Sequence, residues 1–173
     1  MSDPNIYRRL AALEKWQDAM ASVELPRFIG AVYATDAAQS IATGAASVVV
    51  DFEDVIYDPL GLVTTGAGWA FTAPAAGLYQ VTAAILFAGS TGWAAGERGL
   101  LEVFQDGSLV FDLDRKDNYV SGGASLLMRL QGSCAVVCAA GDTLDVRVAQ
   151  SSGAPIALLN QANWNYVSIT RLG

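Results

Sequence analysis

The sequence contains no histidine. Histidine is the side chain that usually serves as a general base near neutral pH, and it is a common ligand of zinc. Its absence excludes Ser-His-Asp and Cys-His catalysis as well as His-ligated zinc sites. We therefore expect a protein that is not an enzyme and that carries neither a metal nor a cofactor.

Basic residues are scarce. The chain has 10 Lys and Arg against 17 Asp and Glu, which gives a formal net charge of −7 and a pI of about 4.3. Nucleic acids and anionic membrane surfaces are bound through clustered Lys and Arg, so the composition disfavours both. No apolar run approaches the roughly 20 residues that a membrane span requires, and we expect no membrane insertion.

Charged residues of either sign make up only 16% of the chain, whereas hydrophobic residues make up 53%. This balance indicates either a large core or apolar surface that is buried against other subunits. The length of 173 residues fits one domain with a short appendage.

The only cysteines are Cys134 and Cys138. In one strand they would lie roughly 13 Å apart, at ~3.3 Å per residue, whereas a disulfide needs Cα atoms within about 7 Å. We therefore expect two free thiols, which suits synthesis in a reducing cytosol. The first residues lack the basic and apolar regions of a signal peptide, so secretion by that route is not expected.

Residues 5–22 predict a helix whose core positions alternate in steps of four and three, the spacing of a coiled-coil seam. These positions are Ile6, Leu10, Leu13, Gln17 and Met20. So short a helix is marginal alone, and it would be stable if the following domain brought several chains together. An amphipathic helix lying on its own domain is the alternative. We predict a coiled-coil trimerisation segment in residues 1–25 and a head domain in residues 26–173.

After residue 25 the sequence predicts an all-β domain centred on the stretch from Trp69 to Phe87. A Pro-containing turn precedes Gly77, and the chain then alternates with the period of a strand. One set of side chains should face the core: Tyr79, Val81, Ala83, Ile85 and Phe87. The other set is also mostly apolar, and we expect it to meet neighbouring subunits: Leu78, Gln80, Thr82, Ala84 and Leu86.

Turn residues divide the remainder of the domain into short segments. Asp106-Gly107 predicts a tight hairpin between residues 100–105 and 108–114. Further strands are expected at residues 28–34, 47–52, 124–130, 133–139, 143–149 and 164–172, and polar loops at 53–68 and 112–123. In the late strands, apolar residues alternate with the others, so that Leu144, Val146 and Val148 share one face of their strand and Val167 and Ile169 share one face of theirs. About ten strands in all predict a two-sheet jelly-roll sandwich.

The order of several residues resembles a known family. A Phe, a Tyr-Asp pair, a Thr-Gly step, a second Phe and Gly-x-Tyr follow one another at Phe52, Tyr57, Asp58, Thr65, Gly66, Phe71, Gly77 and Tyr79. Together they resemble the globular head of complement component one q, which shares a trimeric jelly-roll superfamily with tumour necrosis factor. The chain departs from the pattern at Val81, where the family usually has an aromatic residue. The resemblance implies a homotrimer over residues 28–173.

A short coiled coil followed by such a head looks like a fibre or spike protein of a bacteriophage or phage-derived particle. This resemblance implies assembly in the bacterial cytoplasm and a place on the virion or particle surface. The N-terminal helix would attach to other particle proteins, and the head would bind a host receptor, which we expect to be a glycan. The alternatives are a structural decoration or connector protein and an enzyme that acts on polysaccharide.

Aromatic and amide side chains in or beside loops are the candidate glycan contacts, because ring faces and amides suit sugar surfaces. They are Trp93, Tyr119, Trp164, Asn118, Asn163 and Asn165. The alternative is that the tryptophans are buried at the rim of the head or between subunits. Acidic groups at 51–54 and 112–118 either bind calcium through oxygen ligands or remain solvated loop acids, and the second is expected.

Overall fold

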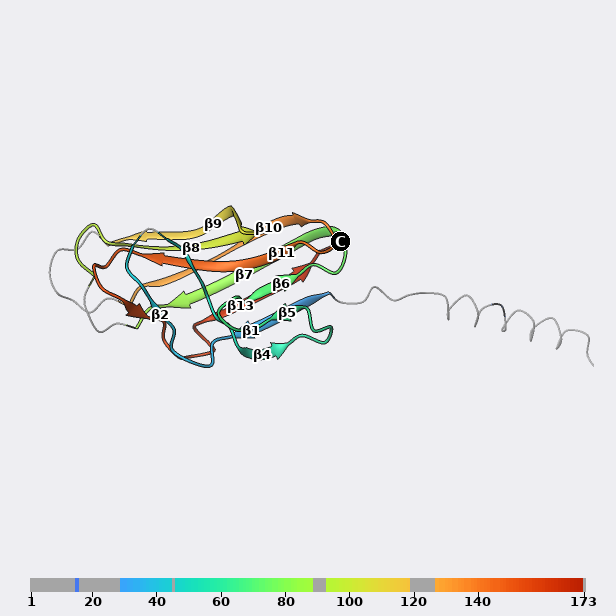
Figure 1. The fold of residues 1–173 in the computed structure, drawn as a ribbon, viewed down its shortest axis with the longest axis horizontal. Helices are drawn as coiled ribbons and strands as arrows, with labels where there is room; N and C mark the ends of the chain where they lie inside the picture. The colour runs from blue at the N-terminus through green and yellow to red at the C-terminus, as the bar shows by residue number, and fades with distance from the viewer. Residues whose placement is uncertain (1–14, 16–28, 45, 89–92, 119–126, 173) are drawn as a thin grey trace, which may run out of the picture.

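The computed structural model describes residues 15, 29–44, 46–88, 93–118 and 127–172. The predicted N-terminal helix therefore lies outside the described residues apart from Lys15. Residues 29–172 form two packed β-sheets (Figure 1). No helix in the described part of the chain has the length and apolarity needed to cross a membrane.

The first sheet has five strands in the order β10-β7-β13-β1-β4. Their bounds are β1 Gly30–Ala34, β4 Asp54–Tyr57, β7 Gly77–Leu86, β10 Arg129–Cys138 and β13 Tyr166–Arg171. All neighbouring pairs are antiparallel, and β7 is paired along its full length with β10. The segment predicted to be central is therefore an inner strand of this sheet.

The second sheet has the order β5-β6-β11-β8-β9, with β3 also paired to β11. Its strands are β3 Val48–Val49, β5 Val63–Thr64, β6 Ala70–Thr72, β8 Arg98–Gln105, β9 Ser108–Asp117 and β11 Thr143–Gln150. A small pair, β2 Ser40–Ile41 with β12 Ile156–Ala157, lies beside them. Apart from the β8–β9 hairpin, the chain changes sheet at each step from β6 to β11, as in a jelly roll.

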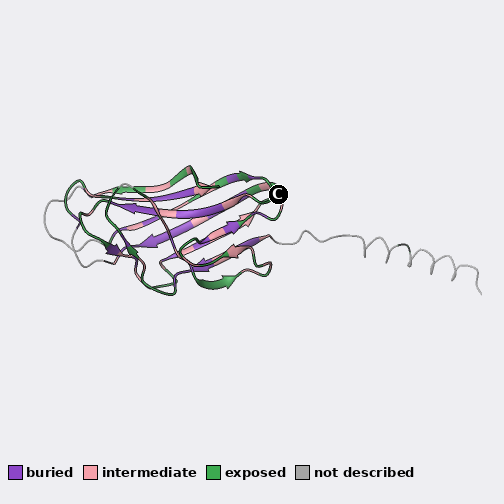
Figure 2. Cartoon of the chain, viewed as in Figure 1, coloured by how far each residue is buried: buried purple, intermediate pink, exposed green. Residues whose placement is uncertain are grey.

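The core lies between the two sheets, and Figure 2 shows buried residues on strands of both sheets. The predicted inward set around β7 is at most 1% exposed at each position, and the alternating apolar residues of β11 and β13 are buried with it. Three residues of the family pattern, Phe52, Phe71 and Tyr79, are fully buried. The Phe71 and Tyr79 rings lie 5.7 Å apart, so this part of the pattern is a packing feature.

The Tyr-Asp pair organises a turn. The Asp58 carboxylate accepts hydrogen bonds from the backbone N–H groups of Leu62 and Val63, at 3.0 and 3.2 Å. It also accepts one from the Tyr33 hydroxyl at 3.0 Å. Burial and the neighbouring Asp58 raise the pKa of Tyr33 to about 12, so this hydroxyl remains a donor at physiological pH. The Asp58 carboxylate thus fixes the residues between β4 and β5 to Tyr33 of β1.

Three of the predicted boundaries between strands and loops were wrong. Residues 53–68 contain the short strands β4 and β5, although they were predicted to be a loop. The polar stretch from Asp112 to Asp117 continues β9, because an edge strand tolerates charged side chains. The two strands predicted on either side of Gly132 are the single strand β10, since this glycine marks a close approach to β9 and not a turn.

Both cysteines lie on β10 as free thiols, which confirms the prediction. Burial raises the pKa of each thiol from its ordinary value of 9.0 to about 11. At pH 8 the folded protein should therefore react with a disulfide reagent roughly a hundredfold more slowly than the urea-unfolded protein, because thiolate is the reactive form. The rate should rise with pH toward 11. Equal rates at pH 8 in the two states would contradict this.

Candidate functional site

One end of the sandwich gathers most of the sequence-predicted site residues. At this end β7 and β9 finish, at Leu86 and Asp117, and β8, β10 and β13 begin, at Arg98, Arg129 and Tyr166. We call it the distal end, because the chain enters β1 at the opposite end (Figure 1). Trp93, Asn118, Asn163, Trp164 and Asn165 all follow or precede these strand ends. Tyr119 lies outside the described residues.

Trp93 and Asn118 support one another at this end. The Trp93 ring is only 3% exposed and packs edge-on against Phe87, with the ring centroids 5.3 Å apart. The Asn118 amide donates to the carbonyl oxygens of Trp93 and Ala94. Both side chains are therefore used to hold the chain in place in a single subunit, as in the alternative that the sequence left open for Trp93.

Asn165 is fully buried and links two strands. Its side-chain oxygen accepts a hydrogen bond from the Leu86 N–H at 2.5 Å, and its amide donates to the Leu159 carbonyl. Next to it, the half-buried Trp164 ring carries the Arg129 guanidinium 4.8 Å from its centroid. Asn163 is exposed. Of the predicted glycan contacts, Asn163 and Trp164 are thus the two whose described side chains reach solvent.

Asn165→Asp tests this structural role. The change replaces a buried amide donor with an acceptor that faces the Leu159 carbonyl, so the free energy of unfolding should fall by about 3 kcal/mol. Asn163→Asp makes the same chemical change at an exposed position and should cost less than about 0.5 kcal/mol. Urea unfolding of both variants measures the difference. Equal stabilities would remove the structural role assigned to Asn165.

A first cavity of about 260 Å³ opens beside β9 and β10, and we call it the β9–β10 cavity. It is lined by Trp93, Lys116, Asp117, Asn118, Leu127, Met128 and Arg129. The Lys116 ammonium donates to the Arg129 carbonyl and lies 3.6 Å from the Asp114 carboxylate, so it bridges the edges of the two sheets. The Arg129 Nε is buried without a hydrogen-bond partner.

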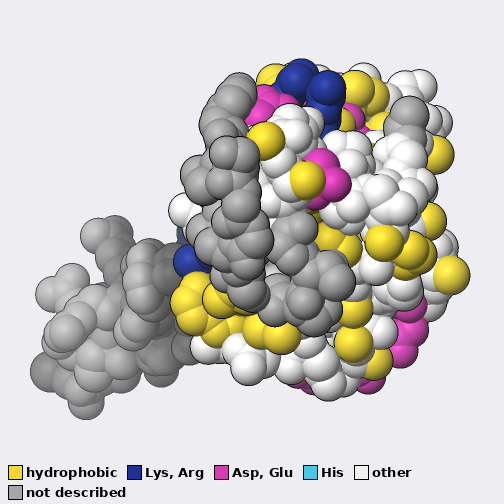
Figure 3. All heavy atoms as spheres, turned by 90° about the vertical axis from the view of Figure 1, so that its left-hand side faces the viewer, with side chains coloured by type: hydrophobic (Ala, Val, Ile, Leu, Met, Phe, Trp, Pro, Cys, Tyr) yellow, Lys and Arg dark blue, Asp and Glu magenta, His cyan; other side chains and the backbone are white. Residues whose placement is uncertain are grey.

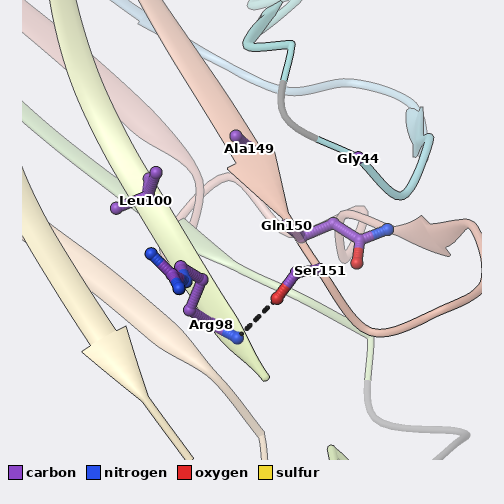
Figure 4. A pocket seen from close by; sticks show the side chains of 6 residues that line it. All are labelled: Gly44, Arg98, Leu100, Ala149, Gln150 and Ser151. Atoms are coloured by element: carbon purple, nitrogen blue, oxygen red, sulfur yellow. Dashed lines mark hydrogen bonds between the residues drawn. The ribbon is translucent and has the colours of Figure 1, made fainter. Parts of the chain in front are cut away.

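A second cavity, of about 400 Å³, lies on the outer face of the other sheet, and we call it the β8–β11 cavity (Figure 4). Its lining residues are Gly44, Arg98, Leu100, Ala149, Gln150 and Ser151. The Arg98 N–H donates to the Ser151 hydroxyl at 2.9 Å, and the Ser151 N–H donates to the Arg98 carbonyl at 3.0 Å. These two bonds fix the distal ends of β8 and β11 relative to one another.

The distal end concentrates positive charge in an acidic head. Residues 29–172 contain six Lys and Arg against 13 Asp and Glu. Four of the six cations, Arg98, Arg115, Lys116 and Arg129, lie at the distal ends of β8, β9 and β10. Figure 3 views this end directly and shows Lys and Arg side chains gathered at the edge of the head where β8 and β9 lie. This end is where the head has most capacity to bind an anion.

The acidic group near residue 51 forms a separate hollow of about 250 Å³ with Asp36, Asp51 and Glu53 in its lining. Repulsion from Asp51, followed by burial and by Asp36, raises the pKa of Glu53. Among the described residues no three His, Cys, Asp or Glu side chains are grouped so that they could hold a metal ion. Solvated loop acids remain the better description of this group, whereas the acids from Asp112 to Asp117 lie on the edge strand β9, where Asp114 and Asp117 are close to cations.

These features define an all-β jelly-roll head with a cation-rich end. Among solved structures, the chain is similar to the Eiger tumour necrosis factor of S. frugiperda, with 14% identity, a TM-score of 0.61, and coverage of 84% of this chain and 93% of that one. It is also similar to murine APRIL, with 10% identity, a TM-score of 0.57, and coverage of 84% of this chain and 100% of that one. A third similar structure is the globular domain of zebrafish complement 1qA, with 16% identity, a TM-score of 0.54, and coverage of 82% of this chain and 93% of that one.

No family model matches the chain, and no curated protein is similar to it in sequence. The fold is thus the jelly roll found in tumour necrosis factor and complement heads, as the family resemblance predicted. Sequence reasoning missed the cavity residues Arg98, Arg129 and Ser151. The hairpin signal at Asp106-Gly107 was the one available indication that Arg98 would lie near the cations of β9.

Proposed function

We propose that the protein is a trimeric, non-enzymatic fibre or spike protein of a bacteriophage or phage-like particle, and that its head binds a glycan on the host cell surface. One observation carries the proposal. The chain enters the head at one end of the sandwich, while the two cavities and most of the cations lie at the other (Figure 1). A head attached through its N-terminal segment would present this distal end to a cell.

The outer face of the five-stranded sheet supports the trimer. On its three strands β10, β7 and β13, about half of the outward side chains are small, and Arg129 at the distal edge is the one charged residue among them. Thr82 and Ser133 hydrogen-bond to one another at 3.0 Å near the middle of this face. Small uncharged side chains lose little hydration energy on burial, so another copy could pack closely here. Trimerisation is also what the family resemblance implies.

Three heads on one spike would multiply a weak sugar contact into useful avidity. Assembly in the bacterial cytoplasm and display on the particle surface complete the proposal, with the N-terminal helix attached to other particle proteins.

The test uses the full chain in two measurements: sedimentation for the oligomer, and binding of a fluorescently labelled trimer to a panel of bacterial strains and a glycan array. A trimer that binds no strain and no glycan would overturn the receptor-binding proposal.

A structural decoration or connector protein is the second candidate. The edge strand β4 favours it, because Val55, Ile56 and Tyr57 are 55%, 56% and 44% exposed. Consecutive exposed apolar residues on an edge strand suit contact with another protein. Retention of the trimer on particles, combined with no binding to any cell, would select this function.

An enzyme that acts on polysaccharide is the least supported alternative. Glycoside hydrolysis uses two carboxylates on opposite sides of the bond, one of them with a pKa raised by an apolar pocket. Among the described residues that line the two distal cavities, Asp117 is the one carboxylate. In the hollow beside Asp51, the pKa of Glu53 is raised mainly by neighbouring negative charge, and this side chain is exposed.

A further inference from the structure

We propose that the β8–β11 cavity binds the carboxylate-bearing sugar unit of an acidic glycan. The inference rests on the proposed glycan-binding function and adds the cavity and the charge of the ligand. It does not involve the aromatic residues that the sequence suggested. It follows from three properties of the cavity: its size and floor, its fixed walls, and the charge beside it.

The size and floor of the cavity suit one sugar ring. Its volume of about 400 Å³ lies within the range of roughly 300–1,000 Å³ that is usual for small-molecule sites. Leu100 and Ala149 are opposite one another on β8 and β11 and form an apolar floor (Figure 4). The C–H face of a pyranose ring could lie on such a floor, with its polar groups directed toward the rim.

The end of β11 at Gln150, which lines the cavity, is fixed before any ligand arrives. This side chain is 1% exposed, and its amide donates to the carbonyl oxygens of Ile41 and Ala154, at 3.0 and 2.8 Å. Its oxygen accepts a hydrogen bond from the Ser152 N–H, and its backbone carbonyl accepts one from Gly44. Because these groups are already ordered, binding would lose little conformational entropy.

Two polar groups remain for the ligand. The Ser151 hydroxyl accepts a hydrogen bond from the Arg98 N–H, so its own proton is available to a sugar oxygen. The Arg98 side chain is 46% exposed and lies 3.8 Å from the Asp117 carboxylate, which Arg115 also approaches, at 3.5 Å. Arg98 could therefore turn to a ligand carboxylate while Arg115 continues to pair with Asp117.

The charge of the ligand follows from this arrangement. With a net charge of −7, the protein repels acidic molecules in general. Beside this cavity, however, two guanidinium groups face one carboxylate, and none of the described residues that line the cavity is acidic. A guanidinium binds a carboxylate through two parallel hydrogen bonds, which neutral sugars cannot form. The site should therefore select a uronic or similarly acidic sugar over its neutral counterpart.

The test compares glucuronic acid with glucose, which differ only in the carboxylate, by saturation-transfer difference NMR on the full-length trimer. Glucuronate should bind at millimolar concentration, and glucose at least tenfold more weakly. Arg98→Gln should weaken glucuronate binding about tenfold, and Ala149→Leu, which fills the floor, should abolish it. Arg171→Gln makes the same change of charge at the opposite end of the head and should leave binding unchanged.

Equal binding of glucose and glucuronate would overturn the proposal, as would undiminished glucuronate binding by both cavity variants or no detectable binding of glucuronate by the unaltered trimer. Cell binding separates this proposal from the broader one. If the unaltered trimer and both cavity variants bind cells equally, the receptor-binding function stands and this cavity is not its site. If glucuronate binds as expected and no cell is bound, the cavity stands and the receptor-binding function fails.

Discussion

Ser168→Glu is expected to convert the proposed trimer into monomers. Ser168 lies on β13 in the middle of the five-stranded sheet, opposite Thr82 of β7 and Val32 of β1. Its side chain is on the face that we propose is buried between subunits. A carboxylate there would lose its hydration without gaining a partner, which costs several kcal/mol per ion, and the trimer would contain three. Sedimentation at micromolar concentration measures the change.

Ser108→Glu is the matched control for this substitution. It introduces the same carboxylate in place of serine at an exposed position of β9, in the other sheet. This variant should remain trimeric. Both variants should keep the circular dichroism of the unaltered head, since neither position belongs to the core. A Ser168→Glu protein that sediments as a trimer would show that the subunits meet through another surface.

Gly132→Ala is expected to lower the free energy of unfolding by about 3 kcal/mol or more. Gly132 lies within β10, at the edge where the two sheets approach one another. A Cβ atom at this position would lie 2.4 Å from the backbone oxygen of Leu113 on β9. Backbone cannot rotate away from such a clash, so one of the two strands must move, and the contact between the sheets would weaken.

Gly99→Ala provides the comparison, because Gly99 is also a strand glycine with a close neighbour. The nearest atom to its added Cβ would be the sulfur of Met128, at 2.6 Å, which belongs to a flexible side chain. Rotation of Met128 could relieve this clash, and the loss of stability should be about 1 kcal/mol. Denaturant unfolding compares the two variants. Similar losses would mean that β10 can move away from β9 at little cost.

The sequence determined the parts of this protein that depend on local pattern. Alternation in β7 identified the inward residues, and alternation in β11 and β13 identified which residues share a face, because successive side chains of a strand point to opposite faces. The hairpin turn was also predictable, since Asp106 and Gly107 both adopt positive φ, at 50° and 76°. The spacing of the two cysteines sufficed to exclude a disulfide.

The tertiary structure decided which residues share the distal end. A regular hairpin around Asp106-Gly107 would pair Arg98 with Arg115, but two register shifts in the β8–β9 pair place it opposite Asp117. Bulges of this kind arise where the strands bend to cover the core, so residue types in the hairpin do not predict them. They create the pair of guanidinium groups that face one carboxylate.

Burial at the distal end was likewise decided only in three dimensions. In the sequence, Trp93 and Asn165 lie beside loops and were therefore predicted to be surface contacts. In the structure, the Trp93 ring packs against Phe87, and the Asn165 side-chain oxygen accepts a hydrogen bond from the Leu86 N–H. The β8–β11 cavity combines residues near positions 44, 98 and 150, which no local pattern connects. Periodicity determines which way a side chain points, whereas the packing of distant strands determines what it meets there.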